Sequence, residues 1–183
     1  MGQGARGVGQ EKKRVSRHAA FDPTDIFAAL NAAQVTYLVV GGLAVIFHGI
    51  GRTTGDVDLS VRLTTENLER LAKALKRLGF MPRVPAPVIG LADPKTRRLW
   101  TKQKGMKVYS FIEPYGMPPR NIDIMVEPLK NFEAVYRRRT MVTLRGVPVP
   151  LIPVKELVQM KRKAGRPQDL QDVQDLRLVG RVP

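Results

Sequence analysis

The chain has 183 residues, of which 43% are hydrophobic, and its 31 lysines and arginines outnumber its 16 aspartates and glutamates, giving a formal net charge of +15. This length fits one domain with an ordinary core, and the charge favours a polyanionic partner such as nucleic acid or nucleotide phosphates. The chain has no cysteine, which excludes disulfides and thiolate zinc sites. Any metal must therefore be bound by oxygen ligands or by the two histidines.

An anionic membrane surface is the competing partner for so basic a chain. No stretch approaches the roughly 18 to 20 consecutive apolar residues of a spanning helix, and the N-terminus lacks the apolar core of a signal peptide. We therefore expect a cytoplasmic protein without membrane contact. Residues 1–19 mix glycines with basic residues and show no apolar period, so we predict a disordered basic tail there and a single domain over 20–183. The tail is either a solubilising or vector-derived segment or an RNA-contacting arm.

The first third of the chain alternates between helix and strand patterns. Asp22 and Pro23 begin a helix that runs to about residue 33, and a buried strand follows over 36–42. Residues 43–49 are short and apolar between glycine pairs, which favours a buried helix. In the next strand, 56–61, apolar side chains alternate with polar ones, so one face is free for function.

The rest of the chain is predicted as helices and strands joined by proline-rich turns. The predicted segments are a helix capped by Thr64 or Thr65 and ended by Gly79, a loop from 81 to 106 that is proline-rich over 81–94, strands 107–112 and 121–126, a helix at 131–138, a hairpin at 141–152 turning near Arg145 and Gly146, and helices 154–164 and 167–176. This order predicts a mixed β-sheet flanked by helices, in the α/β or α+β class.

Two of these strands carry carboxylates among core-forming residues. "DVDLSV" places Asp56 and Asp58 on one face, and "NIDIMV" places Asp123 on the polar face of a second strand. A buried carboxylate must pair with a cation, reach solvent or bind a metal. If the two strands are neighbours, three oxygen donors converge, and such a set suits Mg²⁺ (or Mn²⁺) and phosphoryl chemistry. The alternative is simple ion pairing, of Asp56 with Arg52 and of Asp123 with Arg120.

Several neighbouring residues admit two interpretations each. Gly41 and Gly42 either expose backbone N–H groups to a phosphate or make a tight turn. Arg52 either contacts phosphates or pairs with Asp56. His48 lies in an apolar run, which favours a packed core histidine over a catalytic one. The final helix either lines the site or is a solvated face with Asp172 and Asp175 pointing outward.

The stretch "GGLAVIFHGIGRTTGDVDLSV" resembles the signature of the DNA-polymerase-beta-type nucleotidyltransferase superfamily, in particular the minimal bacterial branch that includes the AbiEii-type toxins of type IV toxin–antitoxin systems. In that family a glycine-containing strand-to-helix turn precedes D-x-D and a third aspartate on a later strand. "KRKAGRPQDLQD" (161–172) is similar to the downstream motif of the same branch. The resemblance covers about residues 20–178 and implies a nucleotidyltransferase fold.

The resemblance also implies roles for individual residues. Gly41 and Gly42 would cradle the nucleotide phosphates, where many members have Gly-Ser and a serine hydroxyl. Asp56, Asp58 and Asp123 would bind Mg²⁺, with Asp123 also helping to deprotonate the attacking hydroxyl. Lys161 would approach the triphosphate, and Asp169 would anchor its motif or line the site.

The leading functional hypothesis is a Mg²⁺-dependent nucleotidyltransferase that moves a nucleoside monophosphate from an NTP to an acceptor. The basic surface favours RNA, including tRNA, as that acceptor. A second hypothesis is a nucleotide-binding or RNA-binding module that keeps the fold without turnover. A third is a toxin neutralised by an antitoxin protein.

Overall fold

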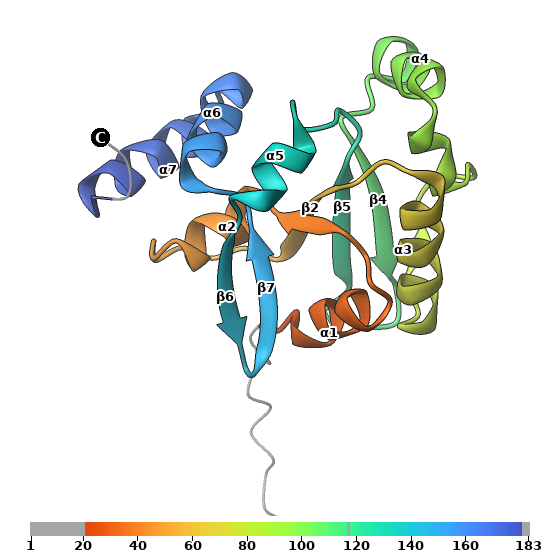
Figure 1. Ribbon diagram of the computed structural model, residues 1–183, viewed down its shortest axis with the longest axis horizontal. Helices are drawn as coiled ribbons and strands as arrows, with labels where there is room; N and C mark the ends of the chain where they lie inside the picture. The colour runs from red at the N-terminus through yellow and green to blue at the C-terminus, as the bar shows by residue number, and fades with distance from the viewer. Residues whose placement is uncertain (1–20, 117, 181–183) are drawn as a thin grey trace, which may run out of the picture.

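The computed structural model describes residues 21–116 and 118–180, so the predicted tail over 1–19 lies outside the described residues. These residues form a mixed sheet with helices around it (Figure 1). The helices are α1 (Thr24–Ala32), α2 (Gly41–Phe47), α3 (Thr65–Arg77), the 3₁₀ helix η1 (Val88–Ala92), α4 (Pro94–Lys104), α5 (Phe132–Arg137), α6 (Val154–Ala164) and α7 (Pro167–Leu178). The strands are β1 (Tyr37–Val39), β2 (Asp56–Val61), β3 (Met81–Pro82), β4 (Val108–Glu113), β5 (Arg120–Met125), β6 (Thr140–Leu144) and β7 (Val147–Leu151).

The sheet has seven strands in the order β3-β4-β5-β2-β1-β7-β6. β2 pairs in parallel with β5 and antiparallel with β1, while β4 pairs antiparallel with β5. The β6–β7 hairpin turns at Arg145 and Gly146, which have φ values of 48° and 85°. Positive φ at both turn residues matches the right-handed twist of the flanking strands, and the hairpin prediction is confirmed.

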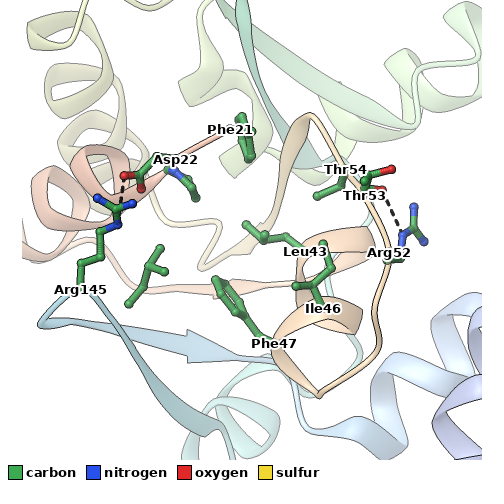
Figure 2. A pocket seen from close by; sticks show the side chains of 11 residues that line it. Phe21, Asp22, Leu43, Ile46, Phe47, Arg52, Thr53, Thr54 and Arg145 are labelled. Carbon is green, nitrogen blue, oxygen red and sulfur yellow. Dashed lines mark hydrogen bonds and ion pairs between the residues drawn. The ribbon is translucent and has the colours of Figure 1, made fainter. Parts of the chain in front are cut away.

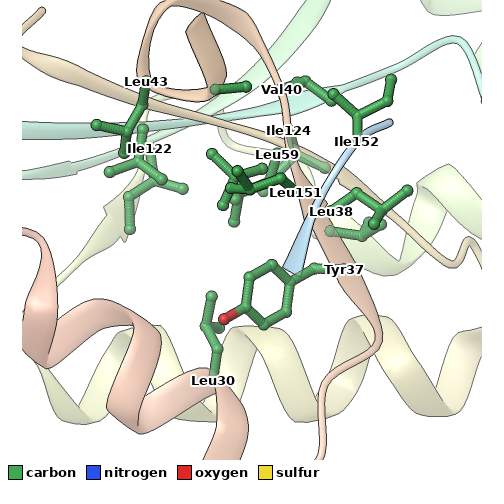
Figure 3. Packing of buried hydrophobic residues seen from close by; sticks show 14 of the residues in the cluster. Leu30, Tyr37, Leu38, Val40, Leu43, Leu59, Ile122, Ile124, Leu151 and Ile152 are labelled. Carbon is green, nitrogen blue, oxygen red and sulfur yellow. The ribbon is translucent and has the colours of Figure 1, made fainter. Parts of the chain in front are cut away.

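The core lies where the apolar face of the central strands meets α1 and α3. Tyr37, Leu59, Ile122 and Ile124 are 1% exposed or less and pack together there (Figure 3). The strand period of two accounts for this, because the polar side chains of β2 and β5 then fall on the opposite face. The predicted α/β class, a mixed sheet flanked by helices, is confirmed.

Two element predictions need correction. The strand predicted over 36–42 ends at Val39, and Gly41 is already the first residue of α2. The predicted loop over 81–106 contains β3, η1 and the eleven-residue helix α4. α4 begins after Asp93, whose side chain accepts hydrogen bonds from the backbone N–H groups of the first turn, and it ends at Gly105.

Different helices lie at the two ends of the sheet. α6 and α7 pack on each other beside α2 at one end, and α4 lies at the other (Figure 1). No helix within the described ranges is long and apolar enough to cross a membrane.

Candidate active site

The parallel pairing of β2 with β5 brings the predicted carboxylates together. In the register of these strands Asp58 lies opposite Asp123, and Asp56 lies opposite Asn121. Neighbouring strands are about 4.8 Å apart, so Asp58 and Asp123 share one patch of the sheet. Val57 and Leu59, on the other face of β2, are fully buried. The two strands that carry the three aspartates are therefore neighbours, which is the condition that the predicted three-aspartate cluster requires.

These carboxylates have no cationic partner among the described residues. None of Asp56, Asp58 and Asp123 forms an ion pair with a lysine or arginine of residues 21–116 or 118–180. Burial raises the pKa of Asp58 to about 6, with the negative charge of Asp123 the second cause, and a hydrogen bond from the Gly42 backbone opposes the shift. The site is thus a concentration of carboxylates without direct ion pairs in a strongly basic protein, with the charge of Lys161 acting on Asp58 only from a distance.

Gly41 is held against Asp58 by the backbone. It has a φ of +61°, and a Cβ atom added to it would lie 1.9 Å from Asp58 Oδ2. No side chain fits in that space, and the left-handed conformation also favours glycine. The first glycine of the pair is therefore required by contact with the carboxylate of the D-x-D motif, which makes the glycines and the acids one structural unit.

The second glycine lies beneath the loop that follows α2. A Cβ atom at Gly42 would lie 3.1 Å from both Arg52 Nη2 and Thr54 Oγ1. The same loop forms one wall of a pocket of about 370 Å³ between α2, the start of α1 and the β6–β7 turn. Figure 2 shows the apolar side chains of Leu43 and Phe47 in this pocket, and Arg52 pointing away from them.

Arg52 points instead to α7, where it meets a buried carboxylate. Asp172 is fully buried, and its Oδ2 lies 2.6 Å from Arg52 Nη1 and 2.6 Å from Lys161 Nζ. Lys161, itself 5% exposed, also lies 3.1 Å from Asp169 Oδ1, and Arg166 pairs with the other oxygen of Asp169. Oδ2 of Asp172 therefore forms ion pairs with both Arg52 and Lys161, the two cations that were predicted to bind phosphate.

The ion pairs of the structure contradict two pairings and one side-chain placement that were considered from the sequence. Arg52 pairs with Asp172 and not with Asp56. Arg120 pairs with Glu113 and Asp25 and not with Asp123. The outward placement of Asp172 is wrong, because the carboxylate is needed inside to balance Arg52 and Lys161.

His48 is packed in the core. It is 7% exposed, and its Nε2 lies 3.0 Å from the carbonyl oxygen of Ile152. This placement agrees with the interpretation as a core histidine, since the ring is held by the backbone after β7.

Sequence reasoning gave no site role to three residues around the carboxylates. Asp172 is the first, and its position three residues after Asp169 on a helix was the local signal. Asn121 and Arg83 are the others: Asn121 Nδ2 donates to Asp56 Oδ1 over 3.1 Å, and Arg83 Nη2 donates to Asn121 Oδ1 over 2.9 Å. Asn121 precedes Asp123 by two residues and therefore shares its face of β5.

The carboxylates of the site can be compared with the ligands that a divalent metal ion requires. Within residues 21–116 and 118–180, no three carboxylate or imidazole groups already form a cluster able to hold a metal. Mg²⁺ usually takes only one or two protein carboxylates together with water and substrate phosphates. Two adjacent, unpaired carboxylates whose mutual repulsion a cation would relieve therefore fit Mg²⁺.

Comparison with known proteins gives the fold a name. No protein-family model matches the chain, and no curated protein sequence matches it significantly. The crystal structure of the lincosamide antibiotic adenylyltransferase LnuA with lincomycin bound has a TM-score of 0.54 at 16% identity, covering 86% of this chain and 98% of that one. The chain has a nucleotidyltransferase fold.

A second similar structure is an antigenic nucleotidyltransferase-like protein from Paracoccidioides brasiliensis, with a TM-score of 0.48, 18% identity and coverage of 84% of this chain and 72% of that one. The similarity to LnuA confirms the predicted nucleotidyltransferase fold. Placement in the AbiEii-type branch stays a prediction, as do the roles of the individual site residues.

The contact between Gly41 and Asp58 gives a first prediction. We expect Gly41→Ala to lower the free energy of unfolding by about 2 kcal/mol or more, because the methyl group adds a clash to an unfavourable φ. Gly55→Ala is the matched control, since Gly55 lies in the neighbouring loop with nothing within 4 Å of its Cβ position. Denaturant unfolding of both variants measures the difference, and equal stability would contradict the contact.

The pKa of Asp58 gives a second prediction. A folded-state pKa of about 6, above the ordinary 3.8, means that the folded chain binds more protons than the unfolded chain between these values. Stability must then fall as pH rises from about 4 to about 6, by up to about 3 kcal/mol relative to Asp58→Asn. Denaturant unfolding at several pH values measures this difference.

Binding of Mg²⁺ should reverse the loss of stability that ionisation of Asp58 causes. At pH 7 we expect added Mg²⁺ to raise the melting temperature of the wild type and to leave that of Asp58→Asn unchanged. The same response in both proteins would place the metal elsewhere.

Proposed function

We propose that this protein is a Mg²⁺-dependent nucleotidyltransferase that moves a nucleoside monophosphate from an NTP to an acceptor and releases pyrophosphate. The observation that carries the proposal is the pair Asp58 and Asp123, adjacent and without cationic partners, against the glycine turn of a nucleotidyltransferase fold. Asp58 and Asp123 would hold the metal, and Asp56, which the sequence resemblance adds as a third ligand, lies two residues before Asp58 on β2. The metal would neutralise charge on the phosphates and the attacking oxygen.

The side chains around the carboxylates suit the remaining tasks. The backbone of Gly41 and Gly42, with Arg52 above them, binds the phosphates and aligns them for in-line attack. Lys161 contributes positive charge from beneath, held in place by Asp169 and Asp172. In the transfer the acceptor oxygen bonds to the α-phosphorus, the bond to the β-phosphate oxygen breaks, and Asp123 takes the hydroxyl proton.

RNA, including tRNA, is the acceptor class that we favour. The chain carries a net charge of +15, and α4 adds an exposed row of Lys95, Arg98 and Lys102 at helical spacing. Such charge favours a phosphate backbone as partner. The role of a toxin with an antitoxin partner is a further proposal that rests on the sequence resemblance. A cytoplasmic location is a further proposal that rests on the hydropathy pattern of the sequence.

A second candidate function is a nucleotide-binding or RNA-binding module without turnover. It is favoured by one observation: Arg52 and Lys161 are already paired with buried carboxylates, so less of their charge is free for a triphosphate. Labelled transfer distinguishes the two candidates.

Incubation with each of the four α-labelled NTPs, Mg²⁺ and total cellular RNA should label an acceptor. Asp58→Asn and Asp123→Asn should each reduce labelling by at least about 100-fold, because each removes a metal-binding carboxylate. Glu69→Gln, an exposed carboxylate on α3, is the control and should retain full activity. No labelling by the wild type with RNA binding intact would favour the module, whereas equal labelling by all of these proteins would contradict the assignment of Asp58 and Asp123 to the reaction.

Asp172 should affect nucleotide binding from a distance. We expect Asp172→Asn to raise the NTP dissociation constant about tenfold, because Arg52 loses the charge that aims it over Gly42. Asp175→Asn is the control on the same helix, since the Asp175 side chain accepts from Gln171. Calorimetric titration measures affinity, and unchanged affinity in a destabilised variant would assign Asp172 a purely structural role.

A further inference from the structure

One face of the sheet next to the carboxylates is open. On β2, β5 and β4, the side chains of Val57, Ile122 and Phe111 face the core and are 2% exposed or less. The opposite face carries Asp58, Asp123 and Ser110 in one row across the same strands, and all three are partly exposed. The carboxylates therefore lie at the border of a solvent-accessible sheet surface.

A second row extends this surface toward the edge of the sheet. Asp56, Asn121, Ile112 and Met81 are successive neighbours on β2, β5, β4 and β3. Met81 is 45% exposed, and Ile112 is partly exposed and lies outside the core cluster. Two strand spacings separate Asn121 from Met81, about 10 Å, which is the length of one nucleoside.

Arg83 supplies the positive charge of this surface. Its guanidinium reaches the open face, because it donates to Asn121, and no carboxylate of the described ranges forms an ion pair with it. On the other side of the aspartates, Arg52, Lys161 and Arg166 come from the loop after α2, from α6 and from the residue that precedes α7. Cationic groups thus flank the acidic centre on two sides, which provides two separate places for anionic ligands.

We infer that Ser110, Ile112, Met81 and Arg83, which we term the acceptor strip, seat the 3′-terminal nucleoside of an RNA acceptor. This inference rests on the proposed function, in which the NTP phosphates take the side of Arg52. The apolar side chains of Ile112 and Met81 contact the base, Arg83 contacts the adjacent phosphate, and the terminal hydroxyl lies near Ser110 and Asp123. RNA fits this strip because it combines an apolar ring with an anionic backbone.

Photocrosslinking locates the terminal nucleoside directly. A single-stranded RNA with 4-thiouridine at its 3′ end is irradiated with the full-length protein, which is then digested with trypsin. Cleavage after lysine and arginine isolates the strip in the peptides 78–83 and 108–120. We expect the adducts in these two peptides. Adducts confined to other peptides would overturn the inference.

Binding measurements test the energetic contribution of the strip. With a 5′-fluorescein RNA and no NTP, Met81→Glu should weaken binding at least fivefold, whereas Met141→Glu, at an equally exposed methionine on β6, should change it less than twofold. Arg83→Gln should lower the slope of log K against log salt by about 1, and more than Lys73→Gln, an exposed lysine on α3. Wild-type levels of binding in both strip variants would overturn the inference.

The two proposals can fail separately. If the strip variants weaken RNA binding and the crosslinks form, but no NTP labels any acceptor, the strip is supported and the enzymatic function fails. If RNA is labelled equally by wild type, Met81→Glu and Arg83→Gln, the enzyme stands and the strip is overturned. Absence of RNA binding by the wild type also overturns the strip.

Discussion

The pairing of β2 with β5 places two carboxylates side by side, and the rest of the site depends on it. Asp58 and Asp123 repel each other, and that repulsion together with burial raises the pKa of Asp58 to about 6. The register cannot shift by one residue to relieve the repulsion, because Val57, Leu59, Ile122 and Ile124 would then turn out of the core. Hydrophobic packing on one face therefore holds an unfavourable charge arrangement on the other.

The basic residues around the site are organised by the opposite kind of interaction. Arg52 and Lys161 meet at one buried oxygen of Asp172, and Arg166 joins through Asp169. Removing one partner of such a network leaves a buried charge without compensation, which is costly. The loop after α2 and the helices α6 and α7 are thereby fixed relative to the glycine turn, and the cations are held near the carboxylates without neutralising them.

Local patterns predicted the parts of the site that depend on local chemistry. The alternation in "DVDLSV" and "NIDIMV" placed Asp56, Asp58 and Asp123 on polar faces, and the glycine pair was located at the junction of a strand and a short helix. α4 was missed because Trp100 is its only buried residue, so it has no apolar stripe, although Asp93 and Gly105 mark its ends. The pairing of Asp172 with Arg52 could not be predicted, because the two residues are 120 positions apart along the chain.

That long separation has a consequence for synthesis of the protein. The glycine turn and the D-x-D strand leave the ribosome well before α7 does. A nascent or prematurely ended chain that stops before residue 167 contains the carboxylates but lacks both aspartates that orient Arg52 and Lys161. The order of the elements thus ensures that the cationic half of the site is assembled only after α7 has been synthesised.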